Sequence, residues 1–147
     1  MSARRPQPVL TPLTPAAIFI VATIEDGGEQ QVHDALADIS GLVRAVGFRV
    51  PSSALSLVLG IGSQAWDRLF SGPRPADLHP FVELTGARHH APSTPGDLLL
   101  HIKGISMDVC FELGGRALAA MGDAVTVIDE VHGFKFFEQR DLLGFVD

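Results

Sequence analysis

The side chains that could do acid–base or metal chemistry are few in this chain and widely spaced. Six histidines occur among 147 residues, and only His89 and His90 are neighbours. Adjacent residues of a strand face opposite sides of a sheet, so these two imidazoles do not suit one metal ion. No histidine has the spacing of a zinc motif or a nearby cysteine. The sequence therefore predicts surface or hydrogen-bonded histidines and no metal site, with His101 a core or interface residue.

One carboxylate differs from the others by its surroundings. Asp147 follows Gly144, Phe145 and Val146, and burial among such residues would raise the pKa of its carboxyl group. An acid held in this way can take up and release a proton during a reaction. On the residues alone, Asp147 is a candidate proton shuttle with no reaction attached to it.

Two other features have simpler explanations. Cys110 lies among the apolar positions of an expected helix and is interpreted as a small core residue. Gly60 and Gly62 precede a short helical segment, but the third glycine and the Lys-Ser/Thr of a P-loop are absent, which favours a simple strand-to-helix turn. A single cysteine excludes a disulfide framework and indicates a reducing, cytosolic setting.

Composition narrows the class of protein further. Hydrophobic residues make up 46% and charged residues 19% of the chain, which excludes a disordered or low-complexity protein. Eleven Lys and Arg against seventeen Asp and Glu give a net charge of -6, which argues against nucleic acid as the partner. The first long apolar run, 16–24, is too short to span a bilayer, so no membrane partner is expected.

Hydrophobic periodicity predicts four strands and two long helices. A continuous apolar run indicates a strand buried on both faces, and apolar residues three and four apart indicate an amphipathic helix. The expected strands are 16–24, 55–61, 97–103 and 124–131, and the expected helices run from 29 to 46, ended by Gly47, and from a cap at Ser106 to Gly122. This βαββαβ order is typical of a ferredoxin-like fold of the α+β class, with an antiparallel sheet and helices on one face.

The rest of the chain indicates contacts outside this unit. A short helix at 63–70, capped by Ser63, leads into a proline-rich excursion at 71–96 that we expect Leu78, Phe81, Val82 and Leu84 to anchor. Excursions of this length are usually functional or part of an interface. The first strand is apolar on both sides, so the second sheet face needs a cover, either a second domain or a partner subunit. The aromatic residues before Asp147 favour a segment cut short over a natural terminus.

Several stretches resemble one protein family. Residues 144–147, Gly-Phe-Val-Asp, resemble the start of the Gly-x-x-Asp-Gly motif of dye-decolorizing (DyP-type) haem peroxidases. Other stretches resemble the bacterial B-type branch in the same order, especially the actinobacterial members packaged as encapsulin cargo. These stretches are 39–48, 61–70, 72–75, 89–97 and 129–134. The resemblance covers essentially the whole chain.

The resemblance implies a fold of two ferredoxin-like halves that together make an α+β barrel-like peroxidase, of which this chain matches the N-terminal half. Residues 1–15 would be a Pro-rich arm and 16–147 the N-terminal domain, with the haem-holding C-terminal domain absent from this chain. The implied cofactor is haem b, whose axial histidine and distal arginine would lie in the other half. Asp147 would be the distal acid/base, with Gly144, Phe145 and Val146 beside the haem.

The implied activity is reduction of hydrogen peroxide and oxidation of bulky aromatic or dye-like reductants, although the segment alone is not expected to hold haem properly. The implied assembly is a homo-oligomer, from dimer to hexamer, with 71–96 as the candidate interface. It would be cytoplasmic, inside an encapsulin nanocompartment. Two alternatives stay open: a non-catalytic ferredoxin-like ligand-binding or assembly module, and a chlorite dismutase-like enzyme, against which the Gly-x-x-Asp motif argues.

Overall fold

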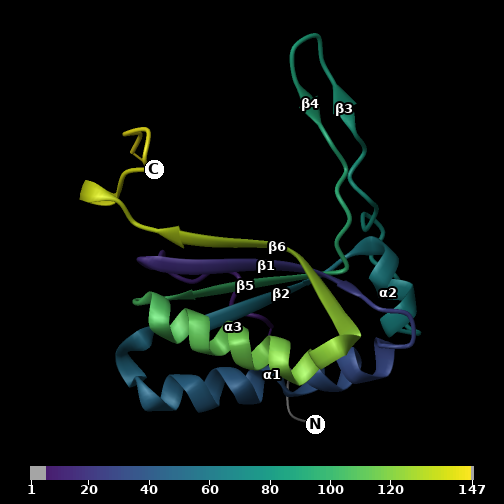
Figure 1. The fold of residues 1–147 in the computed structure, drawn as a ribbon, viewed down its shortest axis with the longest axis horizontal. Helices are drawn as coiled ribbons and strands as arrows, with labels where there is room; N and C mark the ends of the chain where they lie inside the picture. The colour runs from purple at the N-terminus through teal and green to yellow at the C-terminus, as the bar shows by residue number, and fades with distance from the viewer. Residues whose placement is uncertain (1–5, 147) are drawn as a thin grey trace.

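The computed structural model describes residues 6–146, and it places two long helices against one face of a four-stranded sheet (Figure 1). The sheet has the order β2-β5-β1-β6, and all of its pairings are antiparallel. Its strands are β1 (Ala16–Ile24), β2 (Ser56–Ile61), β5 (Leu98–Gly104) and β6 (Val125–Phe134). The helices are α1 (Glu29–Arg49), α2 (Ser63–Leu69) and α3 (Met107–Met121), with short 3₁₀ turns at Pro51–Ser53, Gly122–Ala124 and Phe137–Gln139. The predicted α+β, ferredoxin-like βαββαβ fold is confirmed.

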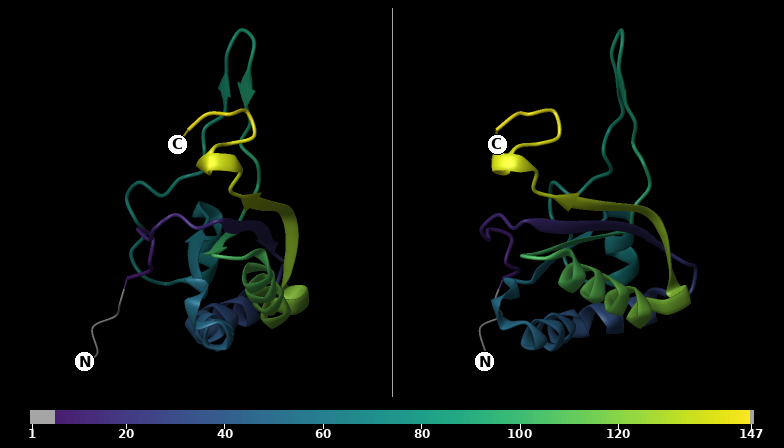
Figure 2. Two further views of the ribbon diagram at one scale, coloured as in Figure 1. Left: turned by 90° about the vertical axis from the view of Figure 1, so that its left-hand side faces the viewer. Right: turned by 60° about the vertical axis from the view of Figure 1, so that its left-hand side comes forward.

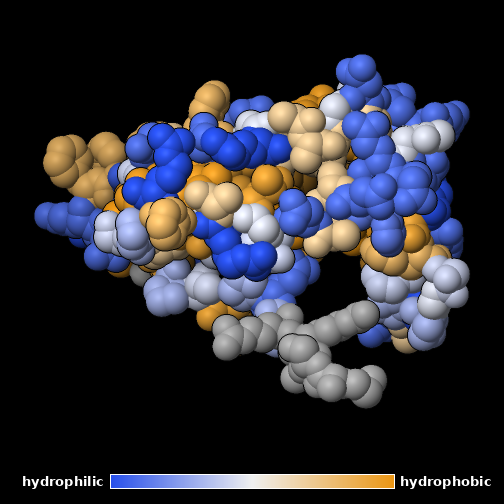
Figure 3. All heavy atoms as spheres, turned by 90° about the horizontal axis from the view of Figure 1, so that it is seen from below, coloured by the Kyte–Doolittle hydropathy of each residue, from blue (hydrophilic) through white to orange (hydrophobic). Residues whose placement is uncertain are grey.

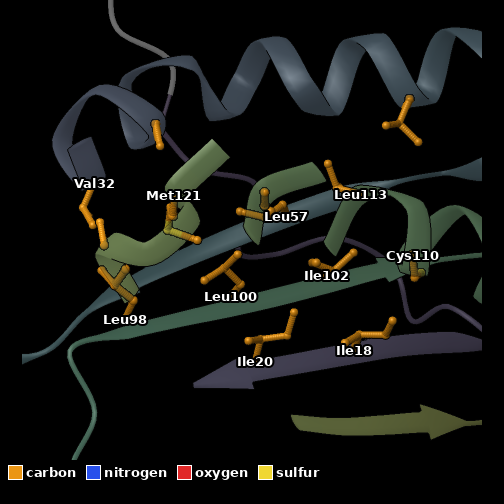
Figure 4. Close-up of a cluster of buried hydrophobic side chains, with 14 of the residues drawn as sticks. Ile18, Ile20, Val32, Leu57, Leu98, Leu100, Ile102, Cys110, Leu113 and Met121 are labelled. Atoms are coloured by element: carbon orange, nitrogen blue, oxygen red, sulfur yellow. The ribbon is translucent and has the colours of Figure 1, made fainter. Parts of the chain in front are cut away.

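The core lies between the sheet and the two long helices (Figure 4). Alternate residues of β1 and β5 point toward the helices because side chains of a strand alternate between faces. They meet α3 side chains that recur every three or four residues. The largest fully buried side chains are Ile18, Leu98, Leu100, Ile102, Leu113, Met121 and Val32. Burying each of these contributes about 1.5–3 kcal/mol relative to exposure.

Helix α1 does not end at Gly47 as predicted but continues to Arg49. Gly47 keeps a helical backbone, and its carbonyl accepts a hydrogen bond of 3.2 Å from the N–H of Val50. The helix stops instead at Arg49, because Val50 precedes Pro51 and a proline disfavours the α conformation of the residue before it. At the end of α3 the prediction is confirmed, since Gly122 takes a positive φ of 51°.

Helix α2 begins at the predicted residue, but Ser63 is not its cap. Ser63 is the first helical residue, and Gly62 occupies the N-cap position. A Cβ at Gly62 would collide with the carbonyl oxygen of Gly96. Because the two backbone segments approach so closely, glycine, which has no Cβ, is the residue that fits at position 62.

None of the described helices is long and apolar enough to cross a membrane.

The N-terminal arm, residues 6–15, is hydrogen-bonded to the sheet at two places. The Gln7 side-chain amide accepts from the N–H of Leu59 at 2.7 Å and donates to its carbonyl at 2.9 Å. The Pro15 carbonyl accepts from the N–H of Lys135 at 2.9 Å. Because Leu59 belongs to β2, the arm occupies part of the outer edge of the sheet.

The face of the molecule that carries the helices shows hydrophilic and hydrophobic surface side by side (Figure 3).

The excursion 71–96 contains a small hairpin of β3 (Leu84–Thr85) and β4 (His90–Ala91), which projects from the sheet (Figure 1). The prediction that apolar residues anchor this excursion is wrong for Phe81, Val82 and Leu84, which are more than half exposed. Leu78 is half-buried. Two-residue strands expose no face wide enough to pack on the core. The excursion is instead held at its base, where backbone bonds join the segment before β5 to β1 and to Gly62.

A network around Arg68 ties the base of this excursion to the helices. The guanidinium donates to Glu29 at 2.7 Å, to the Ile24 carbonyl at 3.1 Å and to Asp97 at 3.4 Å. Asp97 also accepts from the Ile24 N–H at 2.8 Å, in a buried position. The bond from Arg68 lowers the pKa of Glu29. One side chain of α2 thus joins the end of β1, the start of α1 and the start of β5.

Replacing Asp97 with alanine is expected to destabilise the chain by about 1–3 kcal/mol, because the Ile24 N–H would be left buried without an acceptor. Urea unfolding followed by circular dichroism measures the change. Glu112→Ala is the matched control. Within the described part of the chain, Glu112 makes only exposed ion pairs on the helices, and its replacement should cost under about 1 kcal/mol. Equal effects of the two substitutions would contradict the role given to Asp97.

Candidate functional site

The face of the sheet away from the helices carries apolar side chains in the described part of the chain. The strand register places Phe19, Val21, Leu99, His101 and Val131 on this open face. Phe19, Leu99 and Val131 are 36–49% exposed. The hairpin β3–β4 and the C-terminal segment both rise on this side of the sheet (Figures 1 and 2). The candidate site therefore comprises the open face and the segments beside it.

His101 lies in the middle of this face, stacked on Phe19 with ring centroids 4.4 Å apart. Partial burial, and secondarily the charge of Lys103, lower the pKa of the imidazole. The neutral ring is thus the favoured form, and it behaves as part of an apolar surface.

The prediction that Cys110 is a core residue is confirmed, because its thiol is fully buried and burial raises its pKa to about 11.

Two further histidines, His132 and His90, lie on different strands and are each close to a glutamate. His132 pairs with Glu130 at 2.6 Å and meets Phe111 of α3 edge to face, on the helix side of the sheet. His90, in β4, lies 3.5 Å from Glu83. Within residues 6–146, no three His, Cys, Asp or Glu side chains gather closely enough to hold a metal ion.

After β6 the chain bends toward the open face and forms a compact turn (Figure 2). Isolated β-bridges pair Arg140 with Phe136 and with Val146. The Arg140 guanidinium donates to the Gly144 carbonyl at 3.0 Å and to Glu138 at 3.3 Å. These contacts bring the two ends of 136–146 together.

Asp141 holds the centre of this turn. Its carboxylate oxygen accepts from the N–H groups of Leu143 and Phe145, each at 2.9 Å. Its own N–H donates to the Phe145 carbonyl at 3.0 Å, and its carbonyl accepts from Gly144 at 3.1 Å. The φ of Gly144 is 92°, a conformation that favours glycine. The predicted site segment is therefore a defined turn.

The structure places the predicted cofactor neighbours on the surface of this turn. Phe145 and Val146 are 68% and 65% exposed, and Leu142, Leu143 and Phe137 are more exposed still. Asp147 lies outside the described residues. Exposed apolar side chains therefore cover much of the surface of this turn.

Sequence reasoning missed Arg140 and Asp141. The signal available for Asp141 was its spacing from Gly144, because an aspartate at the first position of a turn and a glycine at the fourth are typical of a type I turn. No sequence pattern indicated a role for Arg140, because its bond to the Gly144 carbonyl forms only when the whole segment bends.

An antiparallel sheet with helices on one face and an open apolar face on the other defines this chain as a ferredoxin-like domain of the α+β class. Residues 6–135 match the family described as Dyp-type peroxidase, N-terminal. The chain belongs to this family, and the resemblance found in the sequence is confirmed.

Known relatives and structures agree with this assignment. The chain is 73% identical over 142 residues to a dye-decolorizing peroxidase of Mycobacterium tuberculosis and 69% identical over 142 residues to one of Rhodococcus erythropolis. Each match covers 97% of this chain and 42% of the relative. The encapsulated DyP-type peroxidase from Mycobacterium smegmatis superimposes with a TM-score of 0.96 at 66% identity, over 99% of this chain and 47% of that one. The chain thus spans less than half the length of these relatives.

A variant of DypB from Rhodococcus jostii RHA1, 53% identical to this chain with a TM-score of 0.91, was solved in complex with heme. The described residues fit one side of such a group, because exposed Leu143, Phe145 and Val146 can contact a flat apolar ring. The turn 136–146 contains no histidine. This turn would therefore contact the ring through apolar side chains and could not hold the iron through an imidazole.

Proposed function

We propose that this chain is the N-terminal part of a haem-dependent peroxidase that reduces hydrogen peroxide and oxidises bulky aromatic or dye-like substrates. The observation that carries the proposal is the turn at 136–146, which lies on the open side of the sheet in a chain of the Dyp-type family. The proposed domain is 16–147, preceded by an arm at 1–15. The open face would be covered by the second ferredoxin-like half.

In this proposal each residue of the motif has a separate task. Haem b, when bound, supplies the iron at which peroxide is reduced. Asp147 takes a proton from one peroxide oxygen and returns it to the other, as a general acid/base. Phe145 and Val146 exclude water from the site, which strengthens every polar interaction within it. Gly144 allows the bend that brings them there.

A graft tests this function. This chain replaces the 142 matching residues of the M. tuberculosis relative, and the graft is expressed with haem. We expect a Soret band that changes on adding hydrogen peroxide, and peroxide-dependent bleaching of an anthraquinone dye. The unaltered relative is the control. A folded graft that binds haem but bleaches no dye would contradict the proposed function and favour a non-catalytic module.

We also propose that the protein is cytoplasmic, forms a homo-oligomer of two to six copies and is cargo of an encapsulin shell. Support for the last point is that a structural neighbour is described as encapsulated. Co-expression with an encapsulin shell protein, followed by isolation of the shells, tests it. Shells that form without the peroxidase inside would contradict it.

The hairpin β3–β4 is the proposed contact between copies. Replacing residues 82–93 with a short Gly-Ser linker is expected to lower the oligomer mass measured by light scattering. The free energy of unfolding should change by less than about 1 kcal/mol, because the hairpin residues are exposed and leave the core intact. An unchanged mass would contradict the interface.

A further inference from the structure

We propose that Asp141 is a positioning residue for peroxide chemistry, because its carboxylate shapes the turn on which Asp147 follows. This inference rests on the proposed function, in which Asp147 moves the proton. Asp141 is not placed at the reacting atoms. It acts through the backbone of residues 143–146.

The first support is the number of bonds that Asp141 makes within one short turn. One carboxylate oxygen accepts two backbone N–H groups, from Leu143 and Phe145, at 2.9 Å each. The backbone of Asp141 is also bonded to Phe145 and to Gly144. Bonds to a charged acceptor are stronger than bonds between neutral groups. Asp141 thus fixes the backbone on both sides of Gly144.

The second support is the isolation of the turn from the core. In the described part of the chain, the hydrogen bonds recorded for residues 136–146 go to partners within 135–146. Most of the side chains in this turn are exposed. No packing onto the sheet can therefore replace the carboxylate of Asp141. The shape of the turn depends on its own bonds.

The third support is distance along the chain. Phe145, which receives one of the Asp141 bonds, is two residues from Asp147, and consecutive Cα atoms are only about 3.8 Å apart. A displacement of about 1 Å at a reacting group can lower a rate about 100-fold. A fixed backbone at Phe145 and Val146 would therefore help to keep the rate of proton transfer by Asp147 high.

The test compares Asp141→Ala with Asp141→Asn. Alanine removes the acceptor, whereas the asparagine oxygen can still accept both N–H groups. In this chain, hydrogen exchange measured by mass spectrometry should become about 10-fold faster at Leu143 and Phe145 in the alanine variant. It should stay close to wild type in the asparagine variant. Exchange in β1, β5 and α3 should be unchanged in both.

The same two substitutions in the graft test the consequence for chemistry. We expect the bimolecular rate constant with hydrogen peroxide to fall about 10- to 100-fold in Asp141→Ala at equal haem content, and asparagine to restore most of it. Faster exchange with an unchanged rate constant would overturn the positioning role. A graft of wild-type sequence that binds haem and does not react with peroxide would overturn the proposed function itself, whatever the exchange rates.

Discussion

Replacing Asp147 with asparagine in the graft is expected to slow the reaction with hydrogen peroxide by about 100- to 10,000-fold. The amide has nearly the shape of the carboxylate but cannot take a proton from one peroxide oxygen and return it to the other. Stopped-flow absorbance at the Soret band, recorded over a range of peroxide concentrations, gives the bimolecular rate constant. Haem content per protein should stay unchanged.

The matched control is Asp34→Asn, which changes the same functional group on the exposed surface of α1. Among residues 6–146, Asp34 bonds only to neighbours on its own helix, such as Gln30 at 2.9 Å. Its replacement should leave the rate constant within about twofold of wild type, as is usual for surface substitutions. If Asp147→Asn reacts as fast as this control, another group moves the proton.

The second large effect concerns the core. Leu113→Ala is expected to lower the free energy of unfolding of the chain by about 3–5 kcal/mol. Leu113 is fully buried on α3, and a Cβ at the neighbouring Gly114 would touch Ile20 and Ile102 of the sheet. Truncation removes buried methyl groups and leaves a cavity between two layers that cannot close over it. Urea denaturation measured by circular dichroism gives the value.

Phe111→Ala on the same helix separates this effect from helix propensity. Phe111 is 61% exposed and lies edge to face with His132. We expect a loss below about 1 kcal/mol. Equal losses for the two variants would show that the layer between α3 and the sheet is not the main source of stability.

The regular elements could be predicted because their cause is local. The apolar run of β1 identifies a central strand, and β1 does pair on both sides, with β5 and β6. The α1 and α3 periodicities identify the faces that pack on the sheet. The predicted end of β6 was too early, since Phe134 still pairs with Ala16. That pairing depends on a partner more than a hundred residues away.

The errors have a common physical origin in contacts between distant segments. Gly62 replaces Ser63 as the cap because Gly96 passes close by. The exposure of Phe81 and Val82 follows from the projection of the hairpin, which no local pattern encodes. In the candidate site, the motif ending at Asp147 was found by family resemblance. The hydrogen bonds of Arg140 and Asp141 that shape this segment could not be predicted, because they form only when the segment is folded.

The fastening of Gln7 to Leu59 also limits how the sheet can grow. An unpaired sheet edge is a template for strand addition by another molecule. The arm occupies part of the outer edge of β2, whereas β6, at the opposite end of the strand order, pairs only with β1 among the described residues. Strand addition at β2 would first have to break the two bonds between Gln7 and Leu59. Of the two edges of the sheet, β6 is therefore the one more open to a further strand.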